Sequence, residues 1–234
     1  MKGILSFLSR FVLLIIIVVG FSLAYYFELF QYLSFATLKQ YRGTLTGFAE
    51  EHQLLTIASF MLIYIAAVAL SVPGAVFLTL AGGFLFGPIA TVYVVISATI
   101  GATILFLAVR SAIGDYLANK AKGWVAKMEE GFRKNAFNYL LVLRLVPLFP
   151  FWAINVVAAL LAIPLRVFFI ATLIGIIPGS FVYVMVGNSL NAVFQSDQTP
   201  DLRIIFTPAI LLPLLALAVL ALLPVIYKAL KKSA

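Results

Sequence analysis

Long apolar stretches alternate with short polar connections along this chain. The apolar stretches cover residues 11–30, 54–72, 75–112, 137–163, 164–187 and 204–227, and the polar connections cover 31–53, 113–136 and 188–203. Several stretches reach the roughly 20 residues that a helix needs to cross a bilayer. The pattern therefore predicts an all-helical integral membrane protein.

The polar connection at 113–136 has the periodicity of an amphipathic helix. Apolar residues recur there every three or four positions, and charged residues occupy the opposite face. This pattern is typical of a helix lying in the membrane interface, with Trp124 as an anchor. A solvated linker helix is the alternative interpretation.

Composition and charge refine this picture into a topology. Of the residues, 64% are hydrophobic and only 10% are charged, which favours the bilayer over a soluble domain. The net charge of +8 is concentrated at the two termini and in 110–134, which alone carries six lysines and arginines. Lysine and arginine in short loops mark the cytoplasmic side. Six plain spans would place 113–136 outside, against this rule.

A topology with two re-entrant hairpins satisfies every charged segment. In it, residues 54–88 and 137–163 enter the membrane from opposite sides and return to the side they came from. The full spans are then 11–30, 89–112, 164–187 and 204–227. Both termini are cytoplasmic in this arrangement. A pair of kinked spanning helices is the alternative, and it ignores the charge distribution.

Breaker residues support the hairpins. Proline, which removes a backbone donor and clashes with the preceding turn, interrupts both near the middle, at 72–74 and 146–150. The two Val-Pro pairs are 74 residues apart, as are Gly101 and Gly175. Such halves, inserted from opposite sides, form the inverted-topology repeat of many secondary transporters. The chain thus divides into a signal-anchor helix and connection (1–53), a membrane domain (54–190) and a loop, span and basic tail (191–234).

Arg144 is the strongest candidate for chemistry. It lies in the second hairpin, three residues before Pro147, among apolar neighbours. Charged residues at membrane depth are costly and are therefore functional candidates, and a guanidinium suits bidentate binding of phosphate or carboxylate. Asn155 would offer an amide to the same cavity. Snorkelling to the interface, or pairing with a carbonyl of the opposite hairpin, is the structural alternative for Arg144.

Other residues are assigned structural roles. Arg110 and Arg166 are expected at the cytoplasmic boundary, contacting anionic headgroups or fixing helix depth, with Asp115 able to pair with either. Small residues four apart in 83–87 and 175–179 allow close helix contact in lipid. The predicted hinge and packing residues are Pro73, Gly74, Gly82, Gly83, Gly87, Gly175, Pro178 and Gly179.

Catalysis is poorly supported by the residues present. The single histidine, His52, cannot build a His-Glu-x-x-His metal site, and the chain has no cysteine. No basic groove with interleaved aromatics indicates nucleic acid. We therefore expect no enzymatic activity, no metal and no cofactor. The expected partners are membrane lipids, and a homo-oligomer is left open.

Two blocks of residues resemble a known family. The first runs from Pro73-Gly74 to Gly87-Pro88, and the second contains Leu143-Arg144, Pro147, Pro150, Asn155, Gly175, Pro178, Gly179, Tyr183 and Gly187. Over roughly 70–190 they are similar to the DedA, or SNARE-associated Golgi protein (VTT-domain), superfamily, most of all its Tvp-type branch. The resemblance implies two opposed re-entrant hairpins and movement of phospholipids or polyprenyl-phosphate carriers between leaflets, in some members driven by a proton gradient.

The family's arginine of the second hairpin matches Arg144, and Pro147, Pro150 and Asn155 match its neighbours. The chain departs from the family at the first hairpin, where DedA-type members carry an acidic residue associated with proton coupling. Residues 54–88 contain no Asp or Glu. This departure favours passive scrambling or a different cargo.

Three functional hypotheses follow. The leading one is a lipid translocator, in which a phospholipid or lipid-phosphate headgroup binds between the hairpin tips with Arg144 as anion anchor. The second is a small-solute or oxyanion transporter that uses the same cavity. The third is a scaffold without transport activity that docks through 113–136. Short tails and the absence of a sorting motif favour a bacterial inner membrane, with an organellar membrane as the alternative.

Overall fold

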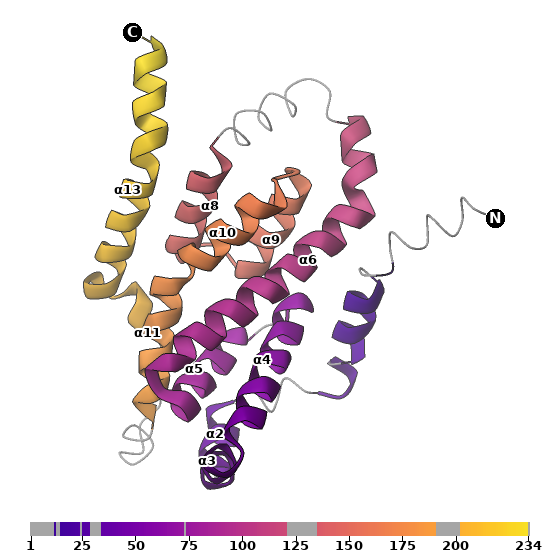
Figure 1. Ribbon diagram of the computed structural model, residues 1–234, viewed down its shortest axis with the longest axis vertical. Coiled ribbons are helices and arrows are strands. Elements are labelled where there is room, and N and C mark those ends of the chain that lie inside the picture. The colour runs from indigo at the N-terminus through magenta and orange to yellow at the C-terminus, as the bar shows by residue number, and fades with distance from the viewer. Residues whose placement is uncertain are drawn as a thin grey trace, which may run out of the picture. The chain divides into compact units, whose positions relative to one another are not determined.

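The computed structural model contains helices joined by short turns, and no strand, in the residues that it describes, which are 12, 15–23, 25–28, 34–72, 74–120, 135–190 and 202–233. Side chains at 113–120, 202, 204 and 226–233 are outside this description, as are Pro73 and the part of the predicted interfacial helix beyond Lys120. The elements are α2 (Phe35–Gln40), α3 (Arg42–Glu51), α4 (Gln53–Ala69), α5 (Ala75–Phe86), η2 (Gly87–Ile89), α6 (Ala90–Lys120), α8 (Ala136–Leu145), α9 (Phe151–Leu160), α10 (Leu165–Gly175), α11 (Ile177–Asn188), η3 (Leu202–Phe206) and α13 (Pro208–Ser233) (Figure 1).

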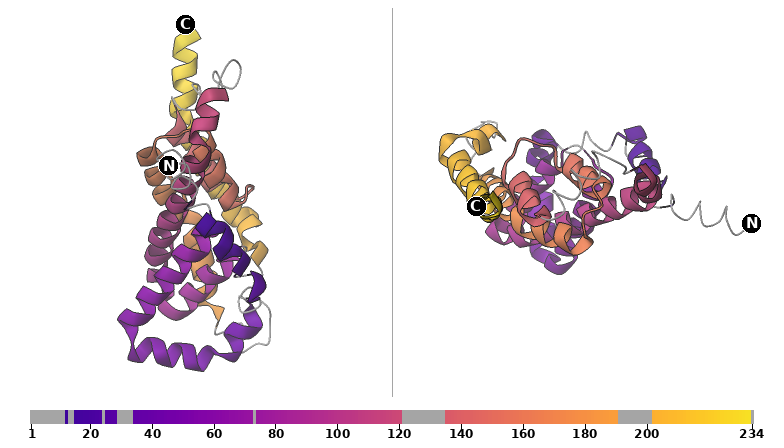
Figure 2. Two further views of the ribbon diagram at one scale, coloured as in Figure 1. Left: turned by 90° about the vertical axis from the view of Figure 1, so that its right-hand side faces the viewer. Right: turned by 90° about the horizontal axis from the view of Figure 1, so that it is seen from above.

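Within those residues, three segments are long and apolar enough to cross a bilayer: Ala75–Ala112, Leu165–Asn188 and Pro208–Val225. The pair α3 and α4 is a fourth candidate, although the chain bends by 119° between them; Figure 2 (left) shows α3 lying across the end of α4. Leu54 and Leu62 on α4 are 84% and 66% exposed, as expected for side chains that face lipid. The predicted all-helical membrane fold is therefore confirmed, with three to four spanning helices.

The helix α6 differs from the predicted boundary at 112. It continues without interruption for 31 residues, from Ala90 to Lys120. No proline follows Pro88 in this stretch, and a lone glycine such as Gly114 costs only about 1 kcal/mol in a helix interior. The beginning of the predicted interfacial helix is therefore a continuation of the spanning helix.

The chain forms two compact units, each with its own pair of short helices. One contains Thr103–Ile176 and Phe206–Ala234 together with the N-terminal Met1–Ile16, and we call it the α8–α9 unit. The other contains Ile17–Ala102 and Ile177–Ile205, and we call it the α4–α5 unit.

In the α4–α5 unit, α4 and α5 pack antiparallel. The Tyr64 hydroxyl lies 2.9 Å from the Thr79 hydroxyl, and the Phe60 and Phe86 rings, farther from the connecting turn, make an edge-to-face contact at 5.4 Å. The turn begins as a Schellman-type cap, with the Val72 amide donating to the Ala67 carbonyl at 2.8 Å. The helical break predicted at 72–74 is present.

The helices α5 and α11 approach each other through glycine. A Cβ added to Gly83 would fall on the Val184 carbonyl, and one added to Gly187 would fall on the Leu80 carbonyl. Leu80, Phe84 and Leu190 form the apolar core beside this contact. Small residues that let backbones meet are the usual device of helix packing in lipid, where no hydrophobic force acts between helices.

In the α8–α9 unit, α8 and α9 are joined by the turn 146–150, as the two prolines predicted. The helix α9 ends like α4, because Ile163 donates to the Ala158 carbonyl at 3.2 Å after Ala162 at a φ of +50°. The helix α13 packs on α8, where the Asn138 amide donates to the Ala221 carbonyl. This framework places α8, α9 and α10 around a single buried charge.

Candidate functional site

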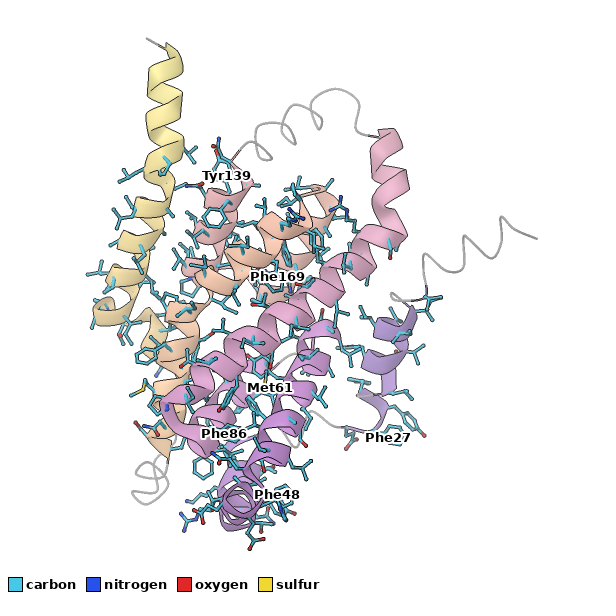
Figure 3. The ribbon with its side chains drawn as sticks, in the orientation of Figure 1. Phe27, Phe48, Met61, Phe86, Tyr139 and Phe169 are labelled. Atoms are coloured by element: carbon cyan, nitrogen blue, oxygen red, sulfur yellow. The ribbon has the colours of Figure 1, made fainter. Side chains whose placement is uncertain are left out.

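Arg144 lies in the last turn of α8, and its guanidinium is bound to the two neighbouring helices. Nη2 donates to the Asn155 Oδ1 on α9 at 2.5 Å and to the Thr172 hydroxyl on α10 at 3.0 Å. Nη1 donates to the Phe151 carbonyl at 3.4 Å. Arg144 is only 9% exposed, and Asn155 and Thr172 are fully buried. Figure 3 locates α8 and α10 by the labels on Tyr139 and Phe169.

Aromatic rings cover the faces of the guanidinium. The Arg144 Cζ lies 4.3 Å from the centre of the Phe151 ring and 5.5 Å from that of Phe168. Phe168 is in turn stacked on Phe106 at 4.4 Å, which fixes its position. Cation–π contacts of this kind gain strength when the cation is desolvated.

Gly175 makes room for the aliphatic stem of the arginine. A Cβ at Gly175 would come within 2.7 Å of the Arg144 Cβ. The predicted packing glycine therefore contacts the candidate site itself.

Among the residues that the structure describes, the positive charge of Arg144 has only neutral partners. Those partners are an amide, a hydroxyl, a backbone carbonyl and aromatic rings, and the chain has no Asp or Glu anywhere between positions 131 and 196. Two donors of the cluster, Arg144 Nε and the Asn155 amide Nδ2, are buried and have no acceptor among the described residues. Buried polar groups are normally hydrogen-bonded, and an unsatisfied one costs about 1–3 kcal/mol. The site therefore has one net positive charge and two vacant donors, which suits an anionic oxygen.

An apolar cavity of about 180 Å³ lies between α8 and α9, lined by residues other than those that contact the guanidinium. Its walls include Leu143 and Ile154, the residues that directly precede Arg144 and Asn155. The other lining residues are also apolar, among them Leu140, Val157 and Leu161. The charged cluster and a hydrocarbon-compatible space thus lie in the same hairpin.

The two prolines predicted in the binding site build the turn. Pro147 lies half-buried within it, and Pro150 is the exposed N-cap of α9, whose carbonyl accepts from the Ala153 amide at 3.0 Å. The polar contacts of Arg144 go instead to Phe151, Asn155 and Thr172.

The two arginines predicted at the cytoplasmic boundary, Arg110 and Arg166, lie on different helices and in different surroundings. Arg110 on α6 donates to the Ile163 carbonyl at 3.0 Å, which ties α6 to the α9–α10 turn. Arg166 on α10 is exposed. The side chain of Asp115 is outside the described residues, so its predicted pairing stays a prediction.

The other predicted hinge and packing residues fall into two groups. Gly82 and Gly83 are close-contact positions, since a Cβ at Gly82 would come within 2.7 Å of the Phe60 ring. Gly74 and Gly87 have φ values of +99° and +66°, which glycine adopts without strain.

The predicted small-residue pair at 175–179 lies on two different helices. The helical path breaks at Ile176, two residues before Pro178, so Gly175 ends α10 and Gly179 belongs to α11. A Cβ at Gly179 would meet only the Ile205 side chain, at 3.9 Å. Close packing is therefore required at Gly175 and not at Gly179.

Sequence reasoning missed Thr172, Phe151 and Phe168. Thr172 is four residues after Phe168 and three before Gly175, so all three lie on one face of α10. A threonine within an otherwise apolar span is a signal that could have identified it, whereas the partners of a phenylalanine depend on tertiary structure.

The sequence profile of the VTT domain matches residues 72–189, just over half of the chain. The chain therefore belongs to the VTT-domain family of integral membrane proteins, within the DedA superfamily, which confirms the resemblance found over roughly 70–190. No solved structure matches the chain.

Named relatives agree with this assignment. Transmembrane protein 41B of Homo sapiens is 30% identical over 189 residues, covering 79% of this chain and 62% of that protein. The Xenopus tropicalis protein of the same name is 31% identical, with 80% and 67% covered. Transmembrane protein 41 homolog of Dictyostelium discoideum is 32% identical, with 82% and 57% covered. The chain thus spans somewhat under two thirds of the human protein's length.

Proposed function

We propose that this protein moves phospholipid or lipid-phosphate headgroups between the two leaflets, with Arg144 as the anion anchor. The observation that carries the proposal is the pair of buried donors, Arg144 Nε and Asn155 Nδ2, which find no acceptor in the described part of the chain, beside a positive charge that has no acidic partner there. A phosphate oxygen would satisfy both donors and the charge together. No covalent chemistry is involved.

The lengths of α8 and α9 support a site inside the membrane. Each has 10 residues, or about 15 Å, which is half of the roughly 30 Å hydrocarbon thickness. If residues near 135 and 163 lie at one interface, the turn 146–150 reaches about the middle of the bilayer. This is the geometry of the re-entrant hairpin that the charge distribution predicts, and it gives Arg144 the role expected of an intramembrane charge.

The apolar cavity favours a lipid over a free oxyanion. A lipid brings a phosphate for Arg144 and a hydrocarbon chain for the 180 Å³ space beside Leu143 and Ile154. A small oxyanion would leave that space without a ligand. The absence of Asp and Glu from 52–114 favours passive scrambling over proton coupling.

Reconstitution tests the proposal. The full chain in liposomes should expose fluorescent phospholipids of the inner leaflet to a membrane-impermeant quencher, without any applied gradient. Arg144→Met should slow this at least about tenfold, the effect of losing hydrogen bonds to a charged group. Arg166→Met, on the exposed arginine of α10, is the matched control.

Equal loss in both variants, or no lipid movement by the wild-type chain under any gradient, would sink the proposal. Uptake of sulfate or phosphate by the same vesicles, abolished by Arg144→Met, would establish the oxyanion transporter instead. Secondary structure by circular dichroism shows that each variant is folded.

The proposed residence is a bacterial inner membrane with both termini cytoplasmic. The chain has no cysteine, so His52→Cys, Ala126→Cys and Ser196→Cys each introduce a single thiol. An impermeant thiol reagent should reach position 126 only from the cytoplasm and positions 52 and 196 only from outside. Labelling of position 126 from outside would contradict the hairpin topology.

A further inference from the structure

A second cavity lies in the α4–α5 unit and has a different chemistry from the Arg144 site. It has a volume of about 510 Å³, within the range typical of small-molecule sites. It is bounded by α3, the start of α4, the end of α5, η2 and the start of α6. Its polar lining residues are Thr46, Glu50 and Gln53, and its aromatic ones are Phe84, Phe86 and Tyr93.

The aromatic side of this cavity is held in place by ring contacts. Phe86 meets Tyr93 edge to face at 5.6 Å, with the ring planes at 88°. On the other side Phe86 meets Phe60 at 5.4 Å and 69°. Figure 3 labels Phe86 at the end of α5 and Phe48 on α3. A preorganised aromatic wall loses little side-chain freedom when a ligand binds.

Of the described residues that line the cavity, Glu50 is the only charged one. The Thr46 hydroxyl donates within its own helix, where its oxygen lies 2.9 Å from the Arg42 carbonyl and 3.2 Å from the Gly43 carbonyl. Glu50 is therefore the group that sets the charge preference of the cavity. A carboxylate facing aromatic rings attracts a cation, above all a bulky and weakly hydrated one.

The bend between α3 and α4 indicates where the cavity lies along the membrane normal. The helix α3 is polar, and the chain turns by 119° into the apolar α4, whose first leucines, Leu54 and Leu55, are 84% and 58% exposed. A polar helix lying across the end of an apolar one marks the boundary of the hydrocarbon region. If the span that follows begins near Pro88, as the sequence predicts, the cavity at this bend lies at the level of lipid headgroups.

We propose that this cavity binds the ammonium group of a zwitterionic phospholipid headgroup, with Glu50 as counter-ion and Phe84, Phe86 and Tyr93 as the aromatic wall. Aromatic cages with a carboxylate are the usual receptors for choline-like cations. The inference deepens the proposed function, because it names the class of lipid that the protein handles. It rests on the proposed function in one respect, namely that the ligand is a lipid.

The first experiment measures binding in the absence of any transport. The full chain in a maltoside detergent is titrated with phosphocholine, and saturation-transfer NMR follows the N-methyl protons. Glu50→Gln should weaken binding about tenfold, and Phe86→Leu several-fold. Glu51→Gln is the matched control, because Glu51 is the adjacent exposed carboxylate on α3 and does not line the cavity.

Absence of phosphocholine binding to the wild-type chain, or equal weakening by Glu50→Gln and Glu51→Gln, overturns the proposal. Wild-type binding that is lost in Glu50→Gln supports it. Thermal unfolding of each variant separates loss of the site from loss of the fold.

The second experiment identifies the source of the ammonium group. The chain in nanodiscs of phosphatidylcholine mixed with phosphatidylglycerol should retain phosphatidylcholine preferentially by native mass spectrometry, and Glu50→Gln should abolish the preference. If soluble phosphocholine binds but no lipid preference exists, the lipid assignment is overturned.

The outcome is distinguishable from that of the proposed function. A chain that scrambles lipids with no headgroup preference retains the Arg144 proposal and refutes this one. A chain that binds phosphocholine at Glu50 but moves no lipid refutes the Arg144 proposal and retains this one.

Discussion

The helix pairs α4–α5 and α8–α9 each consist of two antiparallel helices joined by a turn, but their interiors differ in charge. The first is held by a neutral bond between the Tyr64 and Thr79 hydroxyls and by edge-to-face rings. The second encloses Arg144, whose guanidinium reaches Asn155 and Thr172 on two other helices. Every polar group named in the first pair has a partner, whereas two donors in the second have no acceptor among the residues that the structure describes.

This difference in charge indicates a structural role for the interior of the first pair and marks the second pair as the candidate site. A hydroxyl pair costs little to bury and can stabilise a helix pair without further consequence. A buried guanidinium with neutral partners retains its charge and a desolvation cost, which natural proteins tolerate where the charge is used. The charged interior of the second pair therefore supports the proposed phosphate site there, whereas the neutral bond inside the first pair needs no role beyond packing.

The largest effect is expected where α5 of the first pair packs on α11. Gly83→Val would put side-chain atoms onto the Val184 carbonyl, and this overpacking should lower the free energy of unfolding by about 3 kcal/mol. Gly43→Ala is the control, since a Cβ there has no neighbour within 4 Å. Unfolding by denaturant in detergent, followed by circular dichroism, measures both. A Gly83→Val chain as stable as the wild type would mean that α5 and α11 are not in close contact.

Removal of Asn155 should have the next largest effect, and it tests the charged cluster directly. Asn155→Leu deprives the Arg144 Nη2 of its 2.5 Å acceptor and should cost about 2 kcal/mol, as for hydrogen bonds to charged groups. The double variant Arg144→Met/Asn155→Leu should recover most of this loss, because it removes the buried charge as well. Additive losses in the double variant would show that the two side chains are not coupled.

Thr172→Val should lower the free energy of unfolding somewhat less, by about 1.5 kcal/mol, because the hydrogen bond that the guanidinium loses is longer, at 3.0 Å. The same variant should slow lipid movement less than Arg144→Met does, since the charge remains. Thermal unfolding and the liposome assay give the two values. A drop in transport equal to that of Arg144→Met would make Thr172 a ligand contact in its own right.

The smallest effect is expected from Tyr64→Phe in the first pair. The Thr79 hydroxyl keeps its 3.2 Å bond to the Ala75 carbonyl when the tyrosine hydroxyl is removed. The free energy of unfolding should therefore fall by only about 0.5 kcal/mol. Lipid movement should be unchanged. Loss of transport in this variant would erase the distinction between the two pairs.

Proline and glycine made the breaks in the fold predictable. The prolines at 147 and 150 indicated the turn between α8 and α9, and the Val-Pro-Gly sequence at 72–74 indicated the turn before α5. The proximity of Arg144 and Asn155 followed from hairpin geometry, because each lies close to the same turn. Local sequence rules of this kind act on the backbone directly, so they transfer to the structure.

Other features depended on contacts that no local pattern reveals. The connection 31–53 is largely helical, as α2 and α3, although its polar residues suggested only a connection. Thr172 joins the Arg144 site from α10, 28 residues away. Gly187 was assigned no packing role, because its partner, the Leu80 carbonyl, belongs to a helix more than a hundred residues earlier.

The bond from Arg110 to the Ile163 carbonyl links the protein to the thickness of its membrane. Twenty residues of α6 precede Arg110, a length of about 30 Å, which equals the hydrocarbon thickness of an average bilayer. Lipids with longer acyl chains would draw this guanidinium inward, at a fraction of a kcal/mol per Å of mismatch. The returning limb of the hairpin that holds Asn155 is tied to the same bond. If Arg110 lies at the membrane boundary, as the sequence predicts, acyl-chain length is expected to act mechanically on the Arg144 site without any ligand.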